Sequence, residues 1–202
     1  MKTKLFVVLA FIAVVLQGCI VKSLHPFYSE DKVIFKPELV NVWEDQDGGK
    51  WFVQPVKEKP NAYEMRWNKN GKDAVFIAHL FMLEGEMYFD FLPTSRDGEG
   101  DFHLFNLHLL PTHSVAKVET LNDKQVNIKW FNEEWLSAMF DNNRIKISHE
   151  AVMDELPKDE NDKYYVLTAS TEELQKFIIK YAHENDAYDN DNTVWLRLKR
   201  LI

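Results

Sequence analysis

His79 is the first candidate for acid–base chemistry in this chain, because it is the only polar residue in the apolar run 75–83. A two-residue turn at 84–85 would fold the chain back and place His79 opposite Asp90 in a β-hairpin. A carboxylate beside an imidazole fixes the tautomer of the ring and raises its pKa, as a general base or a metal ligand requires. Because no nucleophile stands beside this pair, a buried hydrogen bond that fixes the strand register is the favoured interpretation.

Three further histidines, His103, His108 and His113, recur at intervals of five residues. An odd spacing places neighbouring side chains on opposite faces of a strand. On a helix, five residues advance about 500°, away from the shared face that metal-binding helices use. We therefore predict no metal site and no cofactor. Ser114 follows His113 but lacks the Gly-x-Ser-x-Gly context of a hydrolase nucleophile.

Aromatic side chains are concentrated in the apolar segments, and most of them must fill a core. A barrel of about eight strands has room for one small ligand. We therefore take His79, Asp90, Phe81 and Tyr88 as candidate pocket residues for a lipid-like molecule. The alternative, which the sequence leaves open, is a filled core without a ligand.

The elements that must position these residues are mostly short strands separated by turn signals. The clearest strand is 62–67, where Tyr63, Met65 and Trp67 alternate with charged residues before the turn Asn70-Gly71. About ten such segments predict an antiparallel barrel or sandwich. The expected strands are 39–44, 51–56, 62–67, 74–83, 87–92, 114–119, 125–131, 144–149, 164–168 and 193–199.

Two helices are expected among the strands. The segment 170–173 reads Ser-Thr-Glu-Glu, a capping box, and begins an amphipathic helix that runs to about Glu184. A shorter helix is expected at 133–140. The chain is therefore predicted to be mainly β (α+β), with a C-terminal amphipathic helix followed by a final strand, in one domain over 38–202.

The N-terminus has the pattern of a secretory signal peptide. Lys2 and Lys4 precede twelve apolar residues, 5–16, which are too few for a membrane span of about 20 residues. The only cysteine, Cys19, follows directly after 16–18 (Leu-Gln-Gly). A lone cysteine also excludes a disulfide framework within the chain.

The segment Leu16-Gln17-Gly18-Cys19 resembles the lipobox of bacterial lipoproteins. This resemblance implies that residues 1–18 are removed as a signal peptide and that Cys19 carries the acyl chains, such as palmitate, of a mature lipoprotein. Several chains hold a protein on a membrane almost permanently. In Gram-negative lipoproteins an aspartate after the cysteine favours the inner membrane. Ile20 stands there instead, which implies the outer membrane of the cell envelope. We expect residues 19–37 to be the lipidated cysteine and a tether.

The net charge of the chain disfavours some classes of binding partner. The chain carries −8 at neutral pH, and removing residues 1–18 takes away two lysines and no acid, which leaves −10. An acidic body disfavours nucleic acid as a partner and is repelled by anionic lipid, so the lipid anchor and not a basic surface would hold it at the membrane.

The order of a barrel, a late helix and a closing strand resembles the lipocalins. Trp43 near the first strand and Arg197 in the last strand are similar to the tryptophan and arginine pair of that family, although Asn41 replaces the family glycine. The resemblance implies a lipocalin-like barrel over residues 38–202, and it transfers no binding residue to this chain.

Together these observations predict a lipid-anchored envelope protein whose domain binds a small apolar ligand or an envelope partner without catalysis. The first alternative is a structural or inhibitory protein with a filled core, which would act through an exposed apolar patch. The second, less favoured, is a hydrolase based on histidine and aspartate, which would need a cleft with perturbed pKa values.

Overall fold

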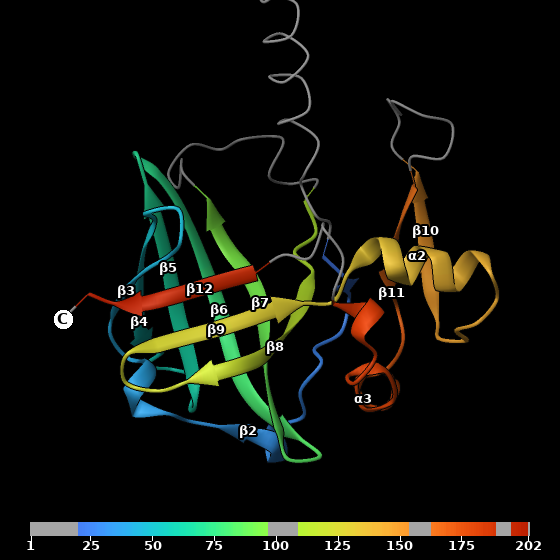
Figure 1. Cartoon of the computed structure of the whole chain (residues 1–202), viewed down its shortest axis with the longest axis horizontal. Coiled ribbons are helices and arrows are strands. Elements are labelled where there is room, and N and C mark those ends of the chain that lie inside the picture. Colours follow the sequence, from blue (N-terminus) through green and yellow to red (C-terminus); the bar gives the residue numbers. More distant parts are fainter. Residues whose placement is uncertain (1–19, 97–108, 154–162, 189–194, 202) are drawn as a thin grey trace, which may run out of the picture.

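The described residues of the chain fold into a closed eight-stranded antiparallel β-barrel with two α-helices beside it (Figure 1). The structure is a computed structural model that describes residues 20–96, 109–153, 163–188 and 195–201. The prediction of a mainly β, lipocalin-like fold is confirmed, as a barrel and not a sandwich. The barrel strands are β3 (Val42–Glu44), β4 (Lys50–Pro55), β5 (Ala62–Lys69), β6 (Lys72–Leu83), β7 (Glu86–Arg96), β8 (His113–Leu121), β9 (Gln125–Trp130) and β12 (Trp195–Arg200).

The last strand closes the barrel. Strands β3 to β9 pair in sequence order, and β12 pairs antiparallel with both β9 and β3. The residue opposite Trp43 is Arg200, whereas Arg197 lies opposite Asn127 and is exposed. The indole of Trp43 donates instead to the carbonyl of Leu39 at 2.9 Å. Trp43 and Arg197 are therefore not cross-strand partners, since three positions of register separate them.

One of the two hydrophobic cores fills the barrel. Its side chains alternate along the strands, as Ala78 and Leu80 do on β6 and Phe89 and Phe91 on β7. The aromatic rings contact one another across the interior, with centroid distances from 5.4 to 6.2 Å. These contacts join Trp51 to Phe76, Phe76 to Phe91, Phe89 to Phe91 and Phe91 to Trp130. Trp43 and Tyr63 are completely buried in the same core.

The hairpin between β3 and β4 is built around the Asp45 carboxylate. Its Oδ1 accepts hydrogen bonds from the backbone N–H groups of Asp47 and Gly49, and its Oδ2 accepts from the indoles of Trp51 and Trp67, both at 3.0 Å. Burial by itself would raise the pKa of Asp45, but these four hydrogen bonds outweigh it and lower the pKa below its usual value. The carboxylate thus joins the turn to two strands.

The N-terminal segment 20–37 belongs to the folded domain, although we expected it to be a tether. It contributes β1 (Lys22–Ser23), which pairs with β8 and β11, and β2 (Val33–Ile34), which pairs with β6. Two short 3₁₀ helices, η1 (Glu30–Lys32) and η2 (Pro37–Leu39), complete it. The segment is part of the domain because it contributes apolar side chains to the core, where Val21 and Phe27 are fully buried.

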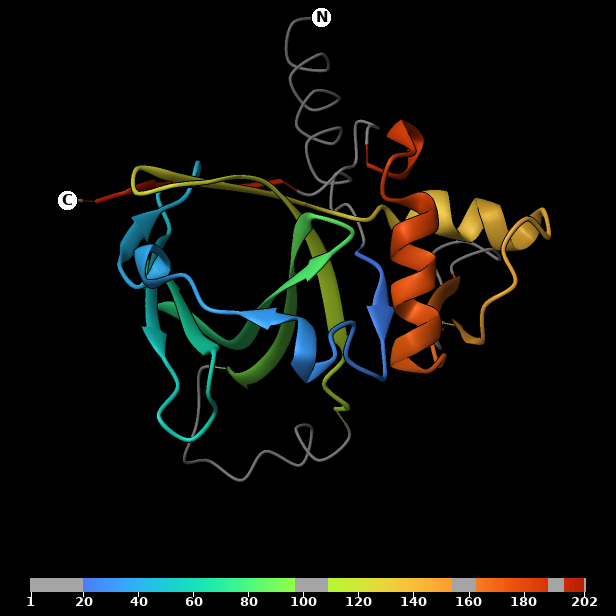
Figure 2. The same cartoon turned by 90° about the horizontal axis from the view of Figure 1, so that it is seen from below.

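The second core lies outside the barrel, between the sheet and the helices. Figure 2, seen along the barrel, shows α2 (Glu133–Asp141) and α3 (Thr171–Tyr181) on one side of the ring of strands. The capping box at Ser170 and Glu173 is confirmed, and α3 buries Leu174, Phe177, Ile178 and Tyr181. A hairpin of β10 (His149–Met153) and β11 (Lys163–Leu167) extends the sheet through β1, and η4 (Asn185–Ala187) follows α3. Within the described ranges, no helix is long and apolar enough to span a membrane.

One expected strand, 144–149, is wrong over most of its length. Residues 144–148 form no ladder, and β10 begins only at His149. The alternation that suggested a strand instead directs Ile145 and Ile147 into the outer core. Asn143, with a φ of 53°, turns the chain out of α2 so that this segment can run along α3.

Candidate functional site

The hairpin β6–β7 fixes the register of the first candidate pair. Glu84 and Gly85 both have positive φ, 47° and 84°, as a two-residue turn of this kind requires. His79 lies directly opposite Asp90, so the predicted register is confirmed.

The two side chains, however, bind different partners. The imidazole of His79, only 6 % exposed, stacks on Tyr28 with ring centroids 4.1 Å apart. The carboxylate of Asp90 is completely buried. Its Oδ1 lies 2.7 Å from Nδ1 of His113, and its Oδ2 accepts a hydrogen bond of 2.8 Å from the backbone N–H of Phe27. The carboxylate therefore holds the N-terminal segment against strands β7 and β8.

The candidate pocket residues face outward from the barrel. Phe81 and Tyr88 belong to the outer core, together with Phe27 and residues of α3. The interior of the barrel at this level is lined by their neighbours Leu80 and Phe89. His79 and Asp90 share the outer face, so all four candidates lie in the packed layer beneath segment 20–37 and the helices.

Burial governs the protonation of this layer. It lowers the pKa of His79 below 6.5, a shift that the charges of Asp90 and Glu30 only partly oppose. Burial, with the same two carboxylates, raises the pKa of Tyr28 to about 12. At neutral pH both rings are therefore uncharged, and their stacking is an apolar contact that helps to seat the N-terminal segment.

The other histidines do not assemble into a metal centre in the part of the chain that the structure describes. His113 lies at the start of β8 and pairs with Asp90, whereas His103 and His108 fall outside the described residues. Across ranges 20–96, 109–153, 163–188 and 195–201, no three His, Cys, Asp or Glu side chains are grouped to hold a metal.

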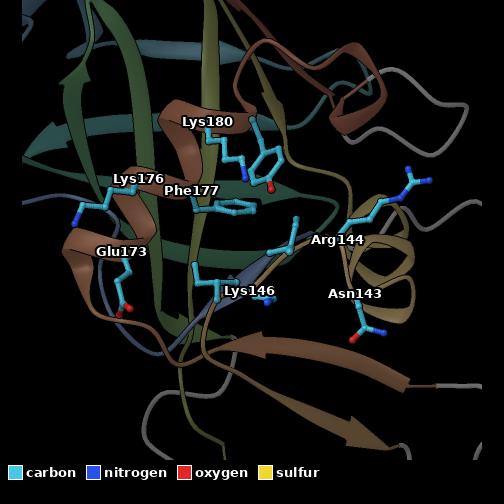
Figure 3. A pocket seen from close by; sticks show the side chains of 10 residues that line it. Asn143, Arg144, Lys146, Glu173, Lys176, Phe177 and Lys180 are labelled. Carbon is cyan, nitrogen blue, oxygen red and sulfur yellow. The ribbon is translucent and has the colours of Figure 1, made fainter.

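A groove that we did not predict lies between α3 and the segment 143–147 (Figure 3). Its volume is about 490 Å³, within the range of about 300–1,000 Å³ of small-molecule sites. Helix α3 lines it with Glu173, Lys176, Phe177, Lys180 and Tyr181, and the facing segment supplies the rest. The floor is apolar, because Ile145, Phe177 and Tyr181 are buried there.

The rim of this groove is mainly basic. Arg144 and Lys146 on the segment and Lys180 on α3 are exposed cations. Lys180 Nζ lies 4.9 Å from the centre of the Tyr181 ring, directly above the apolar floor. Figure 3 shows Phe177 and Lys180 reaching from α3 toward the facing segment, whereas Lys176 points away from it. Lys176 Nζ lies 2.6 Å from Oε1 of Glu172.

Comparisons with known proteins supply no family for this arrangement. No family model, curated protein or solved structure matches the chain. The geometry described above therefore carries the functional argument alone.

Sequence reasoning missed the groove because its two walls come from separate parts of the chain. The signals were present: Lys176 and Lys180 are spaced i, i+4 on one helix, and Arg144 and Lys146 alternate with Ile145 and Ile147. The sequence did not indicate that the alternating segment 143–147 packs along α3 and does not pair in a sheet.

Proposed function

We propose that this protein is a lipid-anchored envelope lipoprotein whose barrel domain is a non-catalytic binding module. The single observation that carries the binding function is the groove of about 490 Å³ beside α3, with its buried apolar floor and exposed polar rim. Concave sites with an apolar lining and a few polar groups are the usual form of small-molecule sites. The site lies on the outside of the barrel, whose interior is occupied by aromatic side chains.

The arrangement of the Asp90 layer supports binding over hydrolysis. Both oxygens of Asp90 already have partners, Phe27 and His113, and the carboxylate has no exposure to solvent. A buried ionisable group needs hydrogen bonds to offset its lost hydration, and these two contacts supply them. The arrangement is therefore explained by a structural role of Asp90.

The lipid anchor rests on the lipobox at residues 16–19, which lies outside the described residues. The residues that directly follow Cys19 support a short connection to the membrane. Ile20 forms a β-bridge with Asn132, and Lys22 Nζ lies 3.6 Å from Glu133 Oε2. A lipidated Cys19 would therefore hold the domain directly at the membrane surface, in our proposal that of the outer membrane, without a long linker.

Native mass spectrometry tests the binding function. The closed barrel and both cores are built from residues 20–201, so a chain of residues 20–202 contains the whole described fold. We expect this chain, purified from cell extract, to carry a stoichiometric small molecule that extraction identifies. A mass equal to that of the protein alone, together with no binding of added ligands, would contradict a small-molecule site.

A second candidate function is a structural or inhibitory protein that docks on an envelope partner. The observation that favours it is the apolar side chain of Met153 at the end of β10, which is 63 % exposed. Cross-linking in the envelope would test it. A single partner whose cross-link is lost with Met153→Ser would favour this function over the small-molecule site.

A further inference from the structure

The charge of the groove is opposite to that of the chain as a whole. The protein carries −8 at neutral pH, so its long-range field repels anions. At the groove, by contrast, Arg144, Lys146 and Lys180 line the rim, and Glu173 is the only acidic residue among the described side chains that line it.

Glu173 does not neutralise these cations. Its Oε2 accepts hydrogen bonds from the backbone N–H and the hydroxyl of Ser170, at 3.1 and 2.9 Å, as part of the capping box of α3. The carboxylate is thereby held at the N-terminus of the helix, where it stabilises the exposed N–H groups. Lys180 lies about two turns further along, so a basic region remains at that end of the groove.

The cations and the apolar floor are close enough for one ligand to contact both. Lys180 Nζ is 4.9 Å from the ring centre of Tyr181, and Lys146 stands between the two isoleucines that the segment directs into the core, Ile145 and Ile147. A ligand that fits this pattern needs an apolar chain for the floor and a negative head for the rim.

Building on the proposed binding function, we propose that the groove between α3 and residues 143–147 binds an anionic amphiphile. One acyl chain lies along the floor of Ile145, Phe177 and Tyr181, and a phosphate or carboxylate head lies among Arg144, Lys146 and Lys180. A cationic amphiphile meets like charge at the rim, and an inorganic anion leaves the floor uncovered. Both parts of the ligand are therefore required.

Isothermal titration calorimetry on residues 20–202 tests this proposal with three probes. Dodecyl phosphate, kept below its micelle concentration, carries both the chain and the anionic head. Dodecyltrimethylammonium has the same chain with a positive head, and inorganic phosphate has the head alone. We expect dodecyl phosphate to bind once per chain, and at least about tenfold more tightly than either of the other probes.

Charge reversal on the rim supplies the matched variants. Lys146→Glu with Lys180→Glu replaces two exposed cations, so the fold is retained, and we expect the affinity for dodecyl phosphate to fall about tenfold or more. Lys57→Glu, in the exposed turn between β4 and β5, alters the charge of the chain without touching the groove. We expect it to change the affinity less than about twofold.

The proposal is overturned if the double variant binds dodecyl phosphate as tightly as the parent chain, or if either control probe binds equally well. The outcome is separable from that for the binding function. A different molecule carried by the purified chain, with no binding of dodecyl phosphate, would overturn the amphiphile and leave the binding function standing. No carried molecule and no binding of any probe would overturn both.

Discussion

Asp90 on β7 and His113 on β8 are joined by a 2.7 Å contact between Oδ1 and Nδ1, although neither is the direct cross-strand partner of the other. The residue opposite Asp90 on β8 is Val115, and His113 lies two positions along the same face. Because the second oxygen of Asp90 holds Phe27, one buried carboxylate connects three segments of chain. Its loss should therefore affect the N-terminal segment as well as the barrel.

We expect Asp90→Ala to lower the free energy of unfolding by about 3 kcal/mol, because it leaves the buried N–H of Phe27 and the ring of His113 without their acceptor. Urea unfolding measures the loss, and limited proteolysis should show earlier cleavage within 20–37. Asp90→Asn keeps one acceptor oxygen and should cost less. Asp123→Ala, at an exposed position, is the control. Equal stability of Asp90→Ala and the control would refute the role of the carboxylate.

The buried imidazole of His79 should make the protein less stable in weak acid. Its pKa is lowered in the folded chain, so its contribution is complete above the unfolded value of 6.5 and is lost as pH falls toward the folded value. The residues that set this environment are Asp90, Glu30, Lys59 and His113.

We expect His79→Phe to reduce the loss of unfolding free energy between pH 7.5 and 5.5, since phenylalanine keeps the stacking on Tyr28 and binds no proton. Urea unfolding at both pH values measures it. If His79→Phe loses as much stability between the two pH values as the parent chain, the imidazole does not titrate differently on unfolding.

Gly49 should tolerate no side chain, because an added Cβ would collide with the indole Nε1 of Trp67 and approach Oδ2 of Asp45. We expect Gly49→Ala to cost about 2–3 kcal/mol through this overlap and the hydrogen bonds it breaks. Gly85→Ala is the comparison: its φ of 84° is unfavourable for alanine, but open space surrounds it, so about 1 kcal/mol is expected. Thermal unfolding ranks the two. A larger loss for Gly85→Ala would contradict the close packing around Asp45.

The proposed lipid anchor depends on one thiol. We expect Cys19→Ser to abolish incorporation of labelled palmitate and to prevent processing by the lipoprotein route, because the acyl chains are attached through this sulfur. Metabolic labelling and the mass of the product measure both effects. Ser23→Ala, inside the domain, is a control that should remain labelled. Labelled Cys19→Ser protein would show that the segment 16–19 is not a lipobox.

The sequence by itself determined those features whose interactions are local. The turn at 84–85 sets the register of His79 and Asp90 through its own two φ angles, and the capping box at Ser170 forms within one helical turn. Strand alternation and the apolar stripe of α3 were likewise readable, because each repeats within a few residues.

Only the tertiary structure decided what those elements face. Closure by β12 determines which side of β6 and β7 is the interior, and thereby turns His79 and Asp90 toward segment 20–37. The partner of Asp90, His113, and the two walls of the groove at α3 and 143–147 come from distant parts of the chain. The period of two along a strand shows that its side chains alternate between two faces. Which of those faces is the interior depends on the segments that pack against each one, and the whole fold decides that.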